Sequence, residues 1–175
     1  MQSAKKQILR ETIQANRPHS SLGLTENLIR LTYELNATVI ASYWPQANEP
    51  DTKEFNDWVQ LMGMRLLTPR VRGESLEFAE GPVAPGAFGI LEPTGNRAMI
   101  LEADLVLVPA LAIDESGNRL GKGKGFYDRA LVGVAAPRYG VIFDSEFLEL
   151  IPTEDHDLAL EGCVSPSAIR HLFIR

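Results

Sequence analysis

Two amphipathic stretches open the chain. In residues 3–16, Ile8, Leu9 and Ile13 share one side, while lysine, arginine and glutamate occupy much of the remainder. This spacing predicts a helix. A second helix is predicted over residues 25–36, because Thr25 is a favourable N-cap residue and leucines recur at helical spacing after it.

The clearest helical pattern lies between Asp51 and Gly63. Asp51 and Glu54 have the spacing of a capping box, and Gly63 is a favourable helix terminator. Apolar residues recur between them at i, i+3, i+4 and i+7, namely Phe55, Trp58, Val59 and Met62.

Apolar and β-branched runs predict strands at 38–44, 65–71, 76–80, 103–112 and 138–145. The run 103–112 is broken only near its ends, which is typical of a strand buried on both faces. Helices alternate with these strands and no linker divides the chain. We therefore expect a single α/β domain over residues 1–175, with three α/β/α layers around a mostly parallel sheet.

The remaining segments are predicted as loops and short helices. Residues 81–96 hold several prolines and glycines, which argues against a helix or a central strand. Residues 114–125 are expected to form a glycine-rich loop. Short helices are predicted at 126–133 and 146–151.

Composition narrows the function classes. The 175 residues carry a formal charge of −6, with 45% hydrophobic and 23% charged residues, as in an ordinary globular protein. This charge argues against general affinity for nucleic acid or anionic membrane. Cys163 is the one cysteine, so no internal disulfide is possible, and neither a signal peptide nor a membrane span is expected. A soluble, cytoplasmic protein is predicted.

The segment RLGKGKGFYDR at residues 119–129 carries the main chemical signal. It holds four basic side chains and one acidic one, a net charge of +3 in a chain whose total is −6. Glycines let main-chain N–H groups approach a ligand, and the predicted helix that follows offers further N–H groups, so a phosphate or carboxylate ligand is indicated. A solvated, flexible loop is the alternative. The spacing matches neither a Walker A loop nor a Rossmann fingerprint.

This segment closely resembles the signature of the 5-formyltetrahydrofolate cyclo-ligase family, also called 5,10-methenyltetrahydrofolate synthetase. Further likeness lies in Lys6-x-x-Leu9-Arg10, in Tyr43-x-Pro45 with Glu49, in ADLVLVPALAIDESGNRLG and in RYGVIFDSEFLELIPTEDHD. The resemblance implies one α/β domain that binds ATP and folate in a cleft at the carboxyl ends of its strands.

The resemblance also implies roles for individual residues. It places ATP on Lys6 and Arg10, which share a helix face at i and i+4, and on the loop residues Arg119, Leu120, Gly121, Lys122, Gly123, Lys124, Gly125, Phe126 and Tyr127. Catalysis is assigned to Lys122 and Lys124. An ordinary solvated basic face is the alternative for Lys6 and Arg10, and a core aromatic is the alternative for Phe126 or Tyr127.

Folate is expected at Trp44 and Glu49 and at the loop residues Lys122, Gly123, Lys124, Gly125 and Phe126. A carboxylate suits the donor edge of a pterin, and an indole suits its flat face. The family pattern places Mg²⁺ on Asp128 and Asp157, as carboxylates beside phosphate would require. Glu49 could instead be a plain loop residue, Asp128 a helix-stabilising acid and Asp157 a loop cap.

The resemblance therefore implies an ATP- and Mg²⁺-dependent ligase that cyclises 5-formyltetrahydrofolate to 5,10-methenyltetrahydrofolate and releases ADP and phosphate. Two other functions stay open from the residues. One is a sugar-phosphate isomerase or related acyl-transfer enzyme that binds a phosphate ester. The other is a regulator that binds folate or nucleotide without turnover.

Overall fold

The structure, a computed structural model, describes residues 2–154 and 157–172. Its centre is a seven-stranded sheet made of β1 (Val39–Ala41), β2 (Arg65–Arg72), β3 (Ser75–Ala79), β6 (Leu105–Pro109), β9 (Arg138–Val141), β11 (Gly162–Val164) and β12 (Ile169–His171). The strand order is β12-β11-β9-β6-β1-β2-β3. The inner pairs from β11 to β2 are parallel, and only β3 and β12 at the edges run antiparallel to their neighbours.

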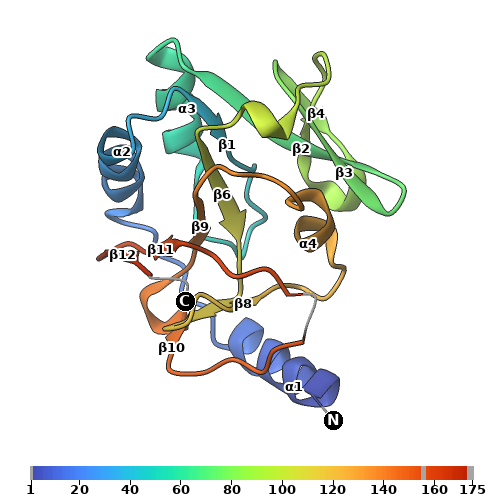
Figure 1. Cartoon of the computed structure of the whole chain (residues 1–175), viewed down its shortest axis with the longest axis vertical. Helices are drawn as coiled ribbons and strands as arrows, with labels where there is room; N and C mark the ends of the chain where they lie inside the picture. The colour runs from blue at the N-terminus through green and yellow to red at the C-terminus, as the bar shows by residue number, and fades with distance from the viewer. Residues whose placement is uncertain (1, 155–156, 173–175) are drawn as a thin grey trace.

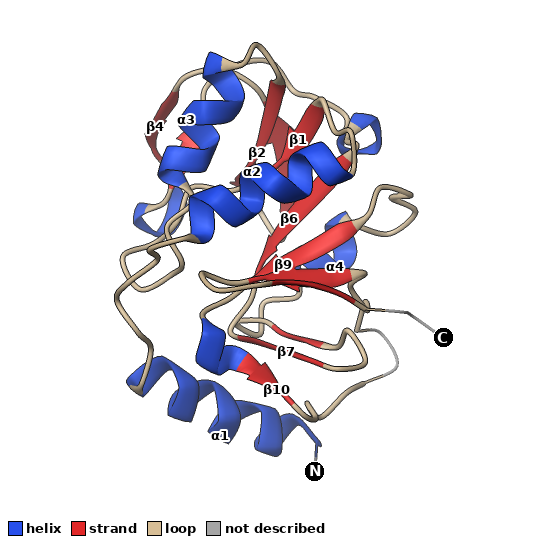
Figure 2. Cartoon of the chain, turned by 90° about the vertical axis from the view of Figure 1, so that its left-hand side faces the viewer, coloured by secondary structure: helices blue, strands red, loops and turns tan. Residues whose placement is uncertain are grey.

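Helices cover both faces of this sheet. Helices α2 (Leu24–Glu34) and α3 (Lys53–Leu61) lie against one face, and the short α4 (Phe126–Ala130) lies on the other (Figures 1 and 2). Helix α1 (Gln2–Ala15) lies apart from them, near the end of the sheet toward which the β6 arrow points (Figure 1). In residues 2–154 and 157–172, no helix is both long and apolar enough to cross a membrane.

Two smaller sheets complete the fold. β7 (Ala112–Asp114) pairs with β8 (Arg119–Leu120) and β10 (Phe147–Leu148) beside α1. β4 (Val83–Pro85) and β5 (Leu91–Pro93) form a two-stranded ribbon. Short 3-10 helices occur at Ala87–Gly89, Ile100–Glu102 and Asp144–Glu146.

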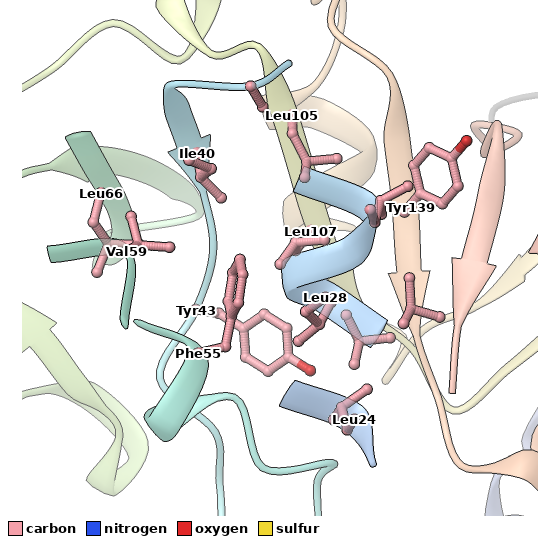
Figure 3. Close-up of a cluster of buried hydrophobic side chains, with 14 residues drawn as sticks. Leu24, Leu28, Ile40, Tyr43, Phe55, Val59, Leu66, Leu105, Leu107 and Tyr139 are labelled. Atoms are coloured by element: carbon pink, nitrogen blue, oxygen red, sulfur yellow. The ribbon is translucent and has the colours of Figure 1, made fainter. Parts of the chain in front are cut away.

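Side chains of the central strands alternate between two cores, which accounts for the layers. Leu105 and Leu107 pack with Leu28 and Phe55 beneath α2 and α3 (Figure 3), while Val106 packs in a second core that includes residues of α4. This period of two is that of a strand buried on both faces. The predicted three-layer α/β architecture around a mostly parallel sheet is confirmed. Truncation of a buried leucine such as Leu107 to alanine is expected to cost about 2–5 kcal/mol of stability.

A third core seats helix α1 under the strand ends. Leu9 and Ile13 of α1 pack against Leu111 and Leu120, which are almost fully buried. The predicted helix at 3–16 is therefore confirmed to within one residue, but the apolar side was assigned wrongly at Ile8, whose side chain is 65% exposed.

The strand predictions were correct in place and wrong in length. The strand in the 38–44 segment ends at Ala41, and the Ser42 N–H makes one further bond to the Leu67 carbonyl of β2, at 2.9 Å. The run 103–112 is not one strand, because the chain leaves the central sheet after Pro109 and begins β7 at Ala112 in another sheet. Predicted strands 65–71 and 76–80 correspond to β2 and β3.

Three irregular or helical predictions were wrong in part. Residues 146–151 form no helix: Glu146 ends a 3-10 turn, and Phe147–Leu148 pairs with β7. The loop 114–125 includes β8, and the segment 81–96 includes the β4–β5 ribbon. In the segment 146–151, the Glu146 carboxylate is buried against Arg17, with Oε1 2.6 Å from the Arg17 Nε.

The helix starts also differ from expectation. Helix α2 is preceded by Gly23 at φ 95°, and Thr25 lies inside the helix, where its hydroxyl donates to Glu54 Oε2. Helix α3 has Thr52 at its N-cap, so Asp51 and Glu54 form no capping box; Asp51 accepts instead from the Lys53 N–H. The predicted helix 126–133 ends early, at Ala130.

Candidate active site

A cavity of about 440 Å³ opens at the carboxyl ends of β1 and β6. These two strands are neighbours, but the chain passes from β1 to β2 on one side and reaches β6 only later on the other. Such a switch in strand order leaves a crevice at the carboxyl ends, which is where open α/β sheets bind ligands. Tyr43 and Trp44 follow β1 into the cavity wall, and Ala110 and Leu111 do so after β6.

Every site residue predicted from the sequence lines this one cavity. They come from α1, from the segment after β1, from the glycine-rich segment and from the region near residue 157. The set is Lys6, Arg10, Trp44, Glu49, Arg119, Leu120, Gly121, Lys122, Gly123, Lys124, Gly125, Phe126, Tyr127, Asp128 and Asp157. Their assembly in one place supports a shared function, while the separate role of each remains a prediction.

The glycine-rich loop has a backbone that glycine favours. Gly123 and Gly125 have φ values of 93° and 63°, in the left-handed region that other residues rarely adopt. A Cβ at Gly123 would also lie 3.4 Å from the guanidinium carbon of Arg10. Arg10 Nε donates to the Gly121 carbonyl at 2.8 Å, so α1 holds the loop against the cavity.

Three cations of the site form ion pairs with carboxylates that also line the cavity. They are Lys122, Arg119 and Lys6. Lys122 Nζ lies 2.7 Å from Glu49 Oε1. Arg119 Nη2 donates to both Asp128 oxygens, at 3.0 and 2.9 Å. One partner of each pair is shielded from solvent, since the Glu49 and Arg119 side chains are each only 8% exposed, while Lys122 is 38% exposed. The charges are therefore positioned before any ligand arrives.

Lys6 is the most deeply buried of these cations. Its side chain is 4% exposed, and Nζ lies 2.9 Å from Glu154 Oε2 and 2.5 Å from Asp157 Oδ2. Burial alone would lower the pKa of Lys6, but its hydrogen bonds to Asp157 and Glu154 outweigh that effect and raise it overall. Lys6 therefore stays charged at neutral pH.

Arg10 and Lys124 differ from the other cations, because neither forms an ion pair with any residue in the described ranges. Lys124 Nζ instead lies 3.4 Å from the centroid of the Phe88 ring, a cation–π contact. Such a contact is weaker than a charge-assisted hydrogen bond to phosphate. These two positive charges can therefore turn to an anionic ligand without breaking an ion pair.

Aromatic residues bring further polar atoms to the cavity wall. The Tyr43 and Tyr127 hydroxyls and the Trp44 Nε1 are buried and have no hydrogen-bond partner within the described residues. Burial raises the pKa of both tyrosines, and the negative charge of Glu49 adds to the effect. The hydroxyls therefore remain protonated at neutral pH and can donate hydrogen bonds.

The two predicted metal ligands line the cavity but are engaged with cations. Asp128 binds Arg119, and Asp157 binds Lys6 and accepts the Glu154 N–H at 2.8 Å. No group of three or more metal-binding side chains occurs within residues 2–154 and 157–172. Mg²⁺ commonly takes only one or two carboxylates and completes its shell with phosphate and water. Two carboxylates in a cation-rich cavity fit that chemistry.

Sequence reasoning missed the apolar residues that line part of the cavity, and it missed one polar and one aromatic contact of the loop lysines. Gln46 accepts from Lys122, and Phe88 faces Lys124 at a positive φ of 57°. The apolar wall comes from β2, β3 and the β4–β5 ribbon, as Val71, Leu76, Ile90 and Leu91. The one available signal was the run GAFGIL, whose apolar residues interrupt a segment rich in turn residues.

Known proteins resemble this chain over most of its length. A 5-formyltetrahydrofolate cyclo-ligase of Mycolicibacterium smegmatis is 35% identical over 147 residues, 76% of each chain. The solved 5,10-methenyltetrahydrofolate synthetase of Aquifex aeolicus superposes with a TM-score of 0.80 at 28% identity, covering 95% of this chain and 92% of that one. A synthetase of that name from Mycoplasma pneumoniae, at 22% identity and a TM-score of 0.75, shares the fold.

Fold, cavity and relatives together define an enzyme of the ligase class. More narrowly, the family model for 5-formyltetrahydrofolate cyclo-ligases matches residues 2–166, and the chain belongs to that family. The resemblance found in the sequence is confirmed, and family membership supports a folate substrate.

Proposed function

We propose that this enzyme uses ATP and Mg²⁺ to convert 5-formyltetrahydrofolate to 5,10-methenyltetrahydrofolate, with release of ADP and phosphate. The observation that carries the proposal is one cavity lined both by cations able to bind phosphate and by a buried carboxylate suited to a pterin. Family membership supports the folate half.

The cationic end of the cavity is assigned to ATP. Lys6 and Arg10 of α1 and Arg119 and Lys124 of the loop region would contact the phosphates, with the main chain of residues 120–127 beside them. Fixed cations stabilise the charge that develops during phosphoryl transfer. Arg10 and Lys124 are the first candidates, because they form no ion pair within the described ranges.

The segment after β1 is assigned to the folate. Glu49 would accept hydrogen bonds from the amino-pyrimidine edge of the pterin, and Trp44 would cover its flat face. Lys122 and the loop through Phe126 would lie between the two substrates. This placement brings the formyl group toward the γ-phosphate.

Asp128 and Asp157 are assigned to Mg²⁺, which would supply charge neutralisation at the phosphates when bound. Each carboxylate now holds a cation. The release of Arg119 or Lys6 toward phosphate would free carboxylate oxygens for the metal ion. The site is thus expected to exchange ion pairs as ATP binds.

The chemistry requires positioning more than a protein nucleophile. The formyl oxygen attacks the γ-phosphorus of ATP, and the bond from that phosphorus to the ADP oxygen breaks. N10 then attacks the activated formyl carbon and gives up its proton, the phosphorylated oxygen leaves as phosphate, which carries that proton away, and the new C–N bond completes the ring. Lys122 and Lys124 are assigned to catalysis because they would neutralise the charge of the transferred phosphoryl group.

Turnover tests the proposal directly. Purified protein should produce the near-ultraviolet absorbance of the methenyl product only when 5-formyltetrahydrofolate, ATP and Mg²⁺ are all present. A regulator would bind ligands and gain thermal stability without this signal. An isomerase of phosphate esters would respond to neither ATP nor folate.

A further inference from the structure

Gln46 contacts both members of the Lys122–Glu49 ion pair in the cavity. Its backbone N–H donates to Glu49 Oε2 at 2.8 Å, and its side-chain Oε1 accepts a hydrogen bond from Lys122 Nζ. Lys122 in turn lies 2.7 Å from Glu49 Oε1, so the three residues form a closed ring of contacts. Gln46 is therefore held by both residues.

The contact with Lys122 fixes which way the Gln46 amide faces. A lysine ammonium can only donate hydrogen bonds, so the amide oxygen must face it and the amide nitrogen must face away. Nε2 donates to no residue in the described part of the chain. Gln46 lines the cavity, and its two N–H groups are thus available to a ligand there.

An acceptor and a donor three positions apart in the chain consequently line the same cavity. The acceptor is the Glu49 carboxylate, and the donor is the Gln46 amide nitrogen. The pterin of a reduced folate has the matching edge: amino and ring N–H donors lie beside the oxygen at ring position 4, which accepts. The two side chains complement both halves of that edge.

We propose that Gln46 is a specificity-determining residue of the folate pocket. Its Nε2 donates to the oxygen at position 4 of the pterin, while Glu49 accepts from the neighbouring donors. The inference rests on the proposed function. A binding site with a fixed hydrogen-bond donor discriminates against an analogue that has a second donor at the facing position. Neither the protein donor nor the ligand donor would then have an acceptor.

Binding of two matched ligands to the whole protein tests this inference. The ligands are 5-formyltetrahydrofolate and its 4-amino-4-deoxy counterpart, in which the position-4 oxygen becomes an amino donor and ring N3 loses its hydrogen. Every protein compared keeps Glu49, so a change of preference between the wild type and a variant reports on residue 46. We expect the wild type to bind the first more tightly. Gln46→Leu should raise the Kd for 5-formyltetrahydrofolate on the order of threefold to tenfold, as loss of one neutral hydrogen bond implies. The preference for 5-formyltetrahydrofolate over the 4-amino ligand should therefore become smaller.

Gln46→Glu gives the sharper result. It replaces the amide donor with an acceptor and should shift the preference toward the 4-amino ligand. Asn48→Leu and Asn48→Glu are matched controls, because Asn48 is exposed in the same segment and does not line the cavity. Both controls should keep the wild-type ratio of the two Kd values.

The ratio of Kd values within one protein is independent of how much of a variant is folded. An unchanged ratio in both Gln46 variants, or an equal loss for both ligands, would overturn the inference and leave Gln46 a structural residue. Formation of methenyl product by the wild type separates this failure from failure of the proposed function. A wild type that neither binds folate nor turns it over would overturn both.

Discussion

Lys122 Nζ lies 2.7 Å from Glu49 Oε1, and this ion pair joins the glycine-rich loop to the segment that follows β1. The two segments are far apart in sequence, and both line the cavity. In the proposed function they serve different substrates. Folate must therefore share or replace Lys122 at Glu49, while Lys122 turns toward phosphate.

Glu49→Gln tests that division of roles. Loss of the carboxylate should raise the KM for 5-formyltetrahydrofolate by about tenfold, as expected for a lost hydrogen bond to a charged group. The KM for ATP should change far less, because Lys122 is released rather than removed. Steady-state kinetics with each substrate varied in turn measure both effects. Equal losses for the two substrates would mark Glu49 as a structural residue.

Lys124→Ala tests the phosphate assignment. The side chain contacts the Phe88 ring and forms no ion pair within the described ranges, so its loss should change the melting temperature little. The KM for ATP should rise at least tenfold, or turnover should cease, because a charge-assisted phosphate contact is lost. Lys53→Ala, at an exposed position of α3, is the control and should behave as wild type. Full activity of a folded Lys124→Ala protein would remove Lys124 from the site.

Asp128→Asn tests the metal assignment. The change keeps the shape of the side chain but removes the charge, so half-maximal activity should require more Mg²⁺, with partial rescue at high Mg²⁺. It also leaves Arg119 without its ion pair and should cost about 2 kcal/mol of stability.

Glu161→Gln is the control for that stability cost. It weakens the partly buried pair with Arg138 on β9, and neither residue lines the cavity. It should lose stability but keep the wild-type Mg²⁺ titration. If the Mg²⁺ dependence of activity in Asp128→Asn is also the same as in the wild type, the metal ion binds elsewhere.

The core of the fold could be predicted from the sequence, because strongly periodic segments determine their own burial. Leu105 and Val106 alternate between two cores, as the run 103–112 suggested. The segment 146–151 was mispredicted because its conformation depends on a distant partner. Arg17, 129 positions away, binds the Glu146 carboxylate immediately before β10 begins. No local pattern carries that information.

In the site too, residues that depend on distant partners could not be predicted from the sequence. Local motifs and the family resemblance supplied Lys122, Lys124 and Glu49, and the structure brought them into one cavity. Gln46 and Phe88 could not be found in this way, because each gains its meaning from a lysine in a distant segment. Their contacts depend on how the loops pack, which the sequence does not specify locally.

Asp104→Asn tests the link between β1 and β6 and gives a pH dependence. Asp104 Oδ2 accepts from the Thr38 N–H, the Thr38 hydroxyl and the Val39 N–H at 2.9 to 3.0 Å. The hydrogen bond from the Thr38 N–H is the main cause of its lowered pKa, which burial only partly opposes. A carboxyl group whose pKa is lowered on folding stabilises the protein above its ordinary pKa of about 3.9. That stabilisation is lost as the pH falls through the folded-state pKa.

The variant should therefore be less stable than wild type at pH 7, by about 1 kcal/mol after allowance for solvent exposure. The difference should begin to shrink below about pH 4, where the carboxyl group of the unfolded chain becomes protonated, and should continue to shrink as pH falls through the lower folded-state pKa. Urea unfolding of both proteins across pH 3 to 7 measures it. A difference that stays constant over this range would mean that the charge of Asp104 contributes nothing.

The stoichiometry of product formation tests the central claim most directly. Methenyl product and ADP are measured in one reaction of purified protein with 5-formyltetrahydrofolate, ATP and Mg²⁺. Phosphoryl activation of the formyl oxygen consumes one ATP for each ring closed, so the two products should form in a ratio of one to one, and neither should form without folate. ADP release without methenyl product would contradict the account, since the phosphoryl acceptor would then be another molecule.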